Sequence, residues 1–216
     1  MIQIEHLSKT YGEEQVLKDI SVSFEKGAIY GLVGANGCGK TTLMRCICGF
    51  SKPSTGKVVV AGKQIGKDVN FAPKTGIIIE SPGFLPHYSG LRNLQILANI
   101  SGGADKTRAA NVMRQVGLDP ANKKPVGKYS LGMRQRLGIA QAIMEDPDIL
   151  ILDEPFNGLD RNAMEEMRGL FQQLKSKGKL IILVSHYVQE ITDNCDTVYE
   201  IVNGSLRLTE KATASA

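Results

Sequence analysis

The chain has 216 residues, of which 42% are hydrophobic and 22% are charged, and its formal net charge is +4. This balance predicts a globular chain with a sizeable core and one domain of ordinary size, and the scattered lysines and arginines do not predict a nucleic-acid-binding surface. No apolar run approaches the roughly 18 residues of a membrane span, and the four cysteines match no zinc-binding spacing, which favours reduced thiols.

Strand-like segments open the chain. The segments "IQIEHLS" (2–8) and "VLKDISVSF" (16–24) alternate apolar and polar residues, as half-buried strands do. The fully apolar "AIYGLV" (28–33) predicts a buried central strand, and "KVVVAG" (57–62) predicts a further strand.

The character of the sequence changes from about residue 85 to 145. Apolar residues three or four apart predict helices in "GLRNLQILANIS", "DKTRAANVMRQVG" and "LGMRQRLGIAQAIM". Strands return in "DILILDEP", "KLIILVSH" and "TVYEIV", with helices between them. Alternating strands and helices predict an α/β fold with a parallel sheet covered on both faces. We therefore expect one domain, with a core over 1–84 and 146–216 and a helical subdomain over about 85–145.

A glycine-rich loop follows the first buried strand. Residues 34–42 read "GANGCGKTT", which fits G-x-x-x-x-G-K-[ST] between a strand and a helix predicted over 41–48. Its glycines let the backbone turn its N–H groups toward phosphate oxygens. Lys40 is expected to reach the β- and γ-phosphates of a nucleotide, and the Thr41 hydroxyl to bind Mg²⁺. The alternative is a glycine-rich turn that matches by chance, which the flanking strand and helix disfavour.

Two later strands also end in polar residues. In "ILILDEP", Asp153 is placed to bind magnesium and Glu154 to hold an attacking water as a general base. His186 comes just past the strand in "LIILVSH". Open parallel sheets bind ligands where their strands end, so these side chains are expected to meet the phosphate loop. A turn with a helix cap, and a structural histidine, are the alternative interpretations.

Taken together, from about Ile2 to Leu208, these motifs resemble the ATP-binding subunit of ATP-binding-cassette (ABC) transporters. The resemblance implies a P-loop NTPase core with a mostly parallel sheet, an N-terminal antiparallel β subdomain and an inserted α-helical subdomain. It implies that Tyr11 of "KTYG" stacks on adenine, that His186 contacts the γ-phosphate, and that Asp160 of "NGLD" faces a second subunit. The loop residues implied in nucleotide binding are Gly34, Asn36, Gly37, Cys38, Gly39, Lys40, Thr41 and Thr42.

The segment "YSLGM" (129–133) is similar to the family signature LSGGQ and precedes a predicted helix. Its Ser130 lies 23 residues before Asp153. Ser130 and Gly132 are kept, whereas a leucine and a methionine replace a glycine and the glutamine. Serine is a good helix N-cap, so this helix presents free N–H groups and its positive end. In the family that end binds the ATP held by the other subunit. An ordinary capped helix is the alternative.

The segment "GIIIESPGF" (76–84) carries a carboxylate at the end of an apolar strand. Family members usually have a glutamine here, followed six residues later by a proline, and Glu80 is followed six residues later by Pro86. The resemblance therefore implies that Glu80 is a ligand of Mg²⁺ or of its water shell. A solvated strand end is the alternative. The variants "IIIESPGF" and "YSLGMRQRLGIA" resemble the bacitracin and lantibiotic resistance branch of the family.

The resemblance implies an ATPase that uses ATP and Mg²⁺. Two copies, or this chain and a close relative, would enclose two ATP molecules head to tail and drive a separate membrane permease, which would be an exporter of a drug or antimicrobial peptide. The chain is then expected to be cytoplasmic, held at the inner face of the membrane by the permease, with no nucleic acid as partner. A soluble ABC-type ATPase acting on ribosomes or DNA is the alternative, although the chain has neither fused cassettes nor a long coiled-coil insertion. A P-loop kinase or GTPase is disfavoured by the signature segment and by the lack of N-K-x-D.

Overall fold

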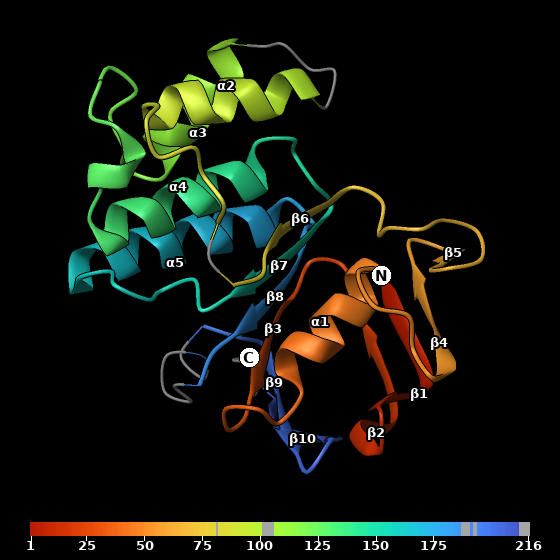
Figure 1. Cartoon of the computed structure of the whole chain (residues 1–216). Coiled ribbons are helices and arrows are strands. Elements are labelled where there is room, and N and C mark those ends of the chain that lie inside the picture. The colour runs from red at the N-terminus through yellow and green to blue at the C-terminus, as the bar shows by residue number, and fades with distance from the viewer. Residues whose placement is uncertain (81, 101–105, 187–190, 192–193, 212–216) are drawn as a thin grey trace.

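The computed structural model describes residues 1–216 except 81, 101–105, 187–190, 192–193 and 212–216. It contains two β-sheets, with the first helix, α1 (Lys40–Cys48), lying between them (Figure 1). The four-stranded sheet is antiparallel and has the order β2 (Glu14–Phe24), β1 (Ile2–Tyr11), β4 (Thr55–Val60), β5 (Lys63–Gln64).

The six-stranded sheet has the order β10 (Ser205–Lys211), β9 (Thr197–Val202), β3 (Ile29–Val33), β8 (Leu180–Val184), β7 (Ile149–Asp153), β6 (Thr75–Ile78). All neighbouring strands in it are parallel except β10, which pairs antiparallel with β9 at the edge. The mostly parallel sheet is therefore confirmed, and β5 and β10 are additions that the sequence patterns did not predict.

The remaining helices gather on one side of the six-stranded sheet (Figure 1). They are α2 (Gly90–Ile100), α3 (Lys106–Gln115), the short 3₁₀ helix η1 (Val126–Lys128), α4 (Leu131–Ile143) and α5 (Arg161–Ser176). The predicted helices of the middle region correspond to α2, α3 and α4, although their predicted ends at Ser101 and Asp105 lie outside the described residues. The boundaries proposed for the helical subdomain stay a prediction.

Each central strand contributes to two separate hydrophobic cores. Leu150 and Leu152 of β7 belong to the core shared with α2–α5, whereas Ile149 and Ile151 belong to the core shared with α1 and the four-stranded sheet. Successive side chains of a strand point to opposite faces. This double burial explains why these strands are continuously apolar in sequence.

The parallel strands end at one edge of the sheet and bring the predicted motifs together. Val184 of β8 pairs with Leu32 of β3 on one side and with Asp153 of β7 on the other. The phosphate loop, the two acids after β7 and the residues after β8 therefore leave the sheet at the same level. Gly49 ends α1 in a left-handed conformation, with φ of 88°.

Candidate nucleotide-binding site

The phosphate loop joins β3 to α1 and wraps around a lysine. The Lys40 side chain is 9% exposed, and its ammonium donates hydrogen bonds to the carbonyl oxygens of Gly34 (2.7 Å) and Ala35 (3.0 Å). Gly34 and Gly39 have φ of 146° and 110°, a region that favours glycine. A Cβ at Gly34 would lie 2.7 Å from the Cys38 sulfur, so the loop is too tight there for any side chain.

One cleft of about 280 Å³ holds both phosphate-binding and carboxylate motifs. Its walls come from the loop and the start of α1 on one side and from the end of β7 on the other. The lining residues are Asn36, Gly37, Gly39, Lys40, Thr41, Thr42, Asp153 and Glu154. Two segments more than a hundred positions apart therefore form one polar site, in which a lysine and a helix N-terminus face two acids.

The acids at the end of β7 fit a divalent cation. Burial raises the pKa of the Asp153 carboxyl above its usual value, and the charge of the adjacent Glu154 raises it further. A cation between the carboxylate and a phosphate would relieve both effects. Magnesium is commonly held by one or two carboxylates together with substrate phosphates. The described residues contain no cluster of three or more histidine, cysteine, aspartate or glutamate side chains that could hold a metal ion.

Glu154 is fixed through both its backbone and its side chain. Its φ of 49° is left-handed, a conformation that costs on the order of 1–3 kcal/mol for a non-glycine residue. Its N–H donates to the Val184 carbonyl (2.8 Å). Its carboxylate Oε2 accepts a hydrogen bond from the Ser185 hydroxyl (3.0 Å). Its Oε1 accepts one from the His186 N–H (2.9 Å) and lies 2.6 Å from the His186 Nδ1. The predicted base and the predicted histidine are therefore in direct contact.

Gln135 of α4 is a supporting residue that the sequence reasoning missed. It is buried, and its side-chain amide donates a hydrogen bond to the Glu154 carbonyl (3.0 Å). The signal was present in the sequence, because Gln135 lies at helical spacing from Gly138, Ile139 and Ala142 on the buried face of α4. A polar side chain on such a face indicates a specific partner.

The signature segment and the "NGLD" segment contact each other away from the cleft. Ser130 caps α4, where its hydroxyl accepts a hydrogen bond from the Met133 N–H (3.2 Å), as predicted. Asp160 caps α5 in the same way, through the Ala163 N–H (2.8 Å). A Cβ at Gly132 would lie 2.6 Å from the Gly158 carbonyl oxygen, so the two segments are closely packed. None of these capping residues lines the cleft with Lys40.

Tyr11 lies at the end of β1, and its hydroxyl lies 3.3 Å from the Ser51 hydroxyl. It pairs with Glu14 across the β1–β2 ladder, and Glu14 lines a cavity of about 520 Å³ that shares Asn36 and Gly37 with the phosphate cleft. The Lys9 ammonium lies 4.7 Å from the Tyr11 ring centroid. The tyrosine ring is half exposed and therefore accessible to a planar ligand.

Glu80 follows β6 in a left-handed conformation, with φ of 63°. Its carboxylate does not line the phosphate cleft but forms an ion pair with Arg45 of α1, with 2.5 Å between Oε1 and Nη2. The strand therefore does deliver a carboxylate to the neighbourhood of α1, and its partner there is an arginine that the sequence reasoning did not single out.

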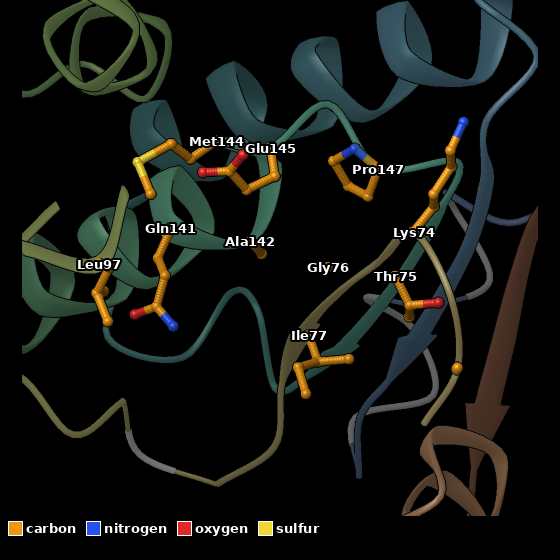
Figure 2. Close-up of a pocket in the computed structure, with 11 residues that line it drawn as sticks. Lys74, Thr75, Gly76, Ile77, Leu97, Gln141, Ala142, Met144, Glu145 and Pro147 are labelled. Carbon is orange, nitrogen blue, oxygen red and sulfur yellow. The ribbon is translucent and has the colours of Figure 1, made fainter. Parts of the chain in front are cut away.

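A separate cavity of about 370 Å³ lies between β6 and the helical region. Figure 2 shows Thr75 and Ile77 on the β6 side and Leu97, Gln141 and Met144 on the helical side. None of the predicted nucleotide-binding residues lines it.

Within the part of the chain that the structure describes, every helix is too short or too polar to cross a bilayer.

Residues 17–157 match the family model described as "ABC transporter". The chain belongs to the ABC transporter family. As a member of this family it is an ATP-binding protein and an ATPase. Among similar proteins, the "Uncharacterized ABC transporter ATP-binding protein YybJ" of Bacillus subtilis is 42% identical, over 98% of this chain and 97% of the relative.

Several ABC relatives have names that state a transported compound. The "Bacitracin transport ATP-binding protein BcrA" of Enterococcus faecalis is 41% identical over 95% of this chain and 68% of the relative. The "Lantibiotic transport ATP-binding protein SrtF" of Streptococcus pyogenes is 34% identical over 100% of this chain and 93% of the relative. The resemblance to this branch of the ABC family is therefore confirmed.

Solved structures agree on the ABC fold. The "ATP binding subunit of ABC transporter" superposes with a TM-score of 0.87 at 25% identity, over 98% of this chain and 90% of that chain. A "Dimeric Structure" of a bacterial ABC transporter cassette gives the same TM-score at 24% identity, over 98% of both chains. The predicted P-loop NTPase fold is thus confirmed.

Replacing Lys40 with alanine is expected to weaken ATP binding itself. The variant loses a charge-assisted contact to phosphate, worth on the order of 1.5–3 kcal/mol, or roughly 10- to 150-fold in dissociation constant. It also leaves the Gly34 and Ala35 carbonyls without the ammonium that joins them. Isothermal titration calorimetry with ATP measures the effect, with Lys63→Ala, an exposed lysine of β5, as the control. Unchanged affinity in the Lys40 variant would remove this side chain from the site.

Proposed function

We propose that this ATPase powers a separate membrane permease that exports a drug or antimicrobial peptide. The observation that carries the proposal is the single cleft in which Lys40, Thr41, Asp153 and Glu154 face one another. The names of BcrA and SrtF support a bacitracin-like or lantibiotic-like peptide as cargo. In this proposal the permease holds the chain at the inner face of the cell membrane. Residues 85–145 form the helical subdomain.

Each residue of the cleft then has a role toward ATP. Lys40 and the loop N–H groups bind the phosphates, which Asn36, Cys38 and Thr42 flank. Magnesium, when bound, neutralises phosphate charge, and the Thr41 hydroxyl and the Asp153 carboxylate would hold it, with Glu80 as a further ligand of the ion or its water shell. Glu154 takes a proton from the attacking water.

His186 lies beside this cleft, because it contacts Glu154, which lines the cleft. In this proposal the contact holds the Glu154 carboxylate in one orientation, and the His186 ring contacts the γ-phosphate. Tyr11, at the end of β1, is proposed to stack on adenine.

The signature segment lies outside this cleft, which supports the proposal that it binds the nucleotide of a second subunit. In a head-to-tail pair, the α4 N-terminus with Ser130 and Gly132 would contact the nucleotide held by the partner chain. Asp160, next to this segment through the Gly132–Gly158 contact, would then face the partner as well. The fold shared with a dimeric cassette supports this arrangement.

The permease is proposed to contact the surface around β6. The cavity of Figure 2 continues into a smaller hollow, because both are lined by Ile77 and Gln141. The smaller hollow is flanked by Phe50, which lies with its ring 5.8 Å from that of Phe71, and both side chains are more than half exposed. Exposed aromatic pairs beside a groove indicate an interaction surface. A cytoplasmic segment of the permease docked there would lie next to the loop that follows Glu80.

Co-purification from the native membrane tests the proposed function. We expect the tagged chain to retain a multi-spanning membrane protein, and the Phe71→Ser variant to retain several-fold less of it while binding ATP normally. Leu208→Ser on β10 is the matched control, because Leu208 is similarly exposed at the opposite edge of the sheet. Recovery of ribosomal material or DNA in place of a membrane protein would favour the soluble ABC-type alternative.

A further inference from the structure

The ion pair between Arg45 and Glu80 joins two elements that the proposed magnesium site also joins. Arg45 lies in the last turn of α1, and Glu80 lies after β6. The pair is close, with 2.5 Å between Nη2 and Oε1, although the side chains of Arg45 and Glu80 are 43% and 63% exposed. Exposed pairs of this kind contribute little to stability. Folding stability alone therefore does not require this pair.

Arg45 and the proposed magnesium ligand Thr41 lie on the same face of α1. They are four positions apart, which places their Cβ atoms about 5–6 Å from each other on a helix. Helical side chains lean toward the N-terminus, so the Arg45 side chain extends toward the turn that carries Thr41. The Glu80 carboxylate can thus pair with either of two cations along α1, the Arg45 guanidinium or a magnesium ion at Thr41, about one helical turn apart.

The Glu80 backbone lies against the other wall of the cleft. Its N–H donates a hydrogen bond to the Asp153 carboxylate, so Glu80 and the proposed metal ligand Asp153 are direct neighbours. The arginine and a metal ion at Thr41 and Asp153 would therefore compete for the same carboxylate, because one carboxylate cannot occupy both geometries fully.

We propose that Arg45 is a positioning residue, which holds the Glu80 carboxylate away from the magnesium site until Mg²⁺ and ATP bind and draw it along α1. This inference rests on the proposed role of Glu80 toward magnesium. It also explains how a glutamate is accommodated beside Asp153 and Glu154 before the metal arrives, since the guanidinium neutralises the third negative charge.

A double-mutant cycle measures the competition through nucleotide binding. For the parent chain, Arg45→Met, Glu80→Gln and the double variant, the dissociation constant of ATP is measured by calorimetry in excess Mg²⁺ and again in EDTA. The quantity compared is the ratio of the EDTA value to the Mg²⁺ value. We expect Arg45→Met to raise this ratio about two- to fivefold, the range of an exposed ion pair, because Glu80 is then free for the metal. The same substitution in the Glu80→Gln background should leave the ratio unchanged.

Control variants separate this inference from the proposed function. Arg207→Met, on β10 at the far edge of the sheet, should keep the parent ratio. If Arg45 has a purely structural role, Arg45→Met changes the dissociation constants in Mg²⁺ and in EDTA alike. If Arg45 contacts the nucleotide directly, the substitution shifts the ratio equally in the parent and in the Glu80→Gln background. Either result overturns the inference. Glu80→Ala should lower the ratio below that of the parent. If it does so while Arg45→Met has no effect, only the inference fails, whereas an unchanged ratio in Glu80→Ala removes the proposed metal role of Glu80 and the inference with it.

Discussion

The Glu154→Gln variant is expected to bind ATP as the parent does and to lose hydrolysis by about 10²–10⁴-fold, the usual contribution of a general base. The amide keeps the size of the side chain: its oxygen can accept from the His186 N–H, and its NH2 can donate to the Ser185 hydroxyl oxygen, which occupies the other site. It cannot take a proton from water. The phosphate loop and Lys40 are unchanged, so the binding step is preserved while the chemical step is lost.

The second consequence of Glu154→Gln is an ATP-bound dimer that no longer opens by hydrolysis. Size-exclusion chromatography with ATP and Mg²⁺ should show the variant at the dimer position and the parent mostly as monomer. Glu165→Gln, on α5, is the control, because Glu165 pairs only at the surface with Arg168 (2.7 Å) among the contacts described. A Glu154→Gln variant with parental turnover would show that this carboxylate is not the base.

The parts of this site that lie within one short segment could be predicted from sequence. The phosphate loop is such a case, because its glycines, Lys40 and Thr41 have to be contiguous for the backbone to surround a phosphate. The end of β7 is another, because a fully apolar strand that ends in two acids is unusual without a ligand. The caps at Ser130 and Asp160 belong here too, since a cap acts within one helical turn.

Contacts between distant segments were not predictable in the same way. The pairing of Arg45 with Glu80 depends on how α1 lies relative to β6, and no local pattern specifies that distance. The hydrogen bond from Gln135 to the Glu154 backbone likewise depends on how α4 packs on β7. A buried polar side chain in a helix pattern indicates that a partner exists but does not identify that partner. The edge strands β5, of two residues, and β10, of seven residues, were missed because they carry few apolar residues.

The Ser130→Arg variant is expected to bind ATP normally as a monomer and to lose ATP-dependent dimerisation. Ser130 lies outside the cleft that contains Lys40, so its own chain's phosphate site is untouched. The arginine places bulk at the start of α4, where Gly132 already packs against the Gly158 carbonyl and leaves little room for adjustment. In the head-to-tail arrangement this surface has to approach the partner's γ-phosphate. Loss of donors at developing charge costs on the order of 10²–10³-fold in rate, so hydrolysis should fall by a comparable factor.

The Ser130→Ala variant separates the effect of bulk from the effect of the cap. Both substitutions remove the hydroxyl that accepts from the Met133 N–H, a loss of about 0.5–2 kcal/mol in helix stability, but only arginine obstructs the surface. We therefore expect similar losses of thermal stability in the two variants, with dimerisation largely kept in alanine and absent in arginine. Calorimetry with ATP, light scattering with ATP and Mg²⁺, and turnover measure the three properties independently. Normal dimerisation and turnover in Ser130→Arg would mean that α4 contributes nothing to the partner's nucleotide, and that each chain hydrolyses ATP with the residues of its own cleft alone.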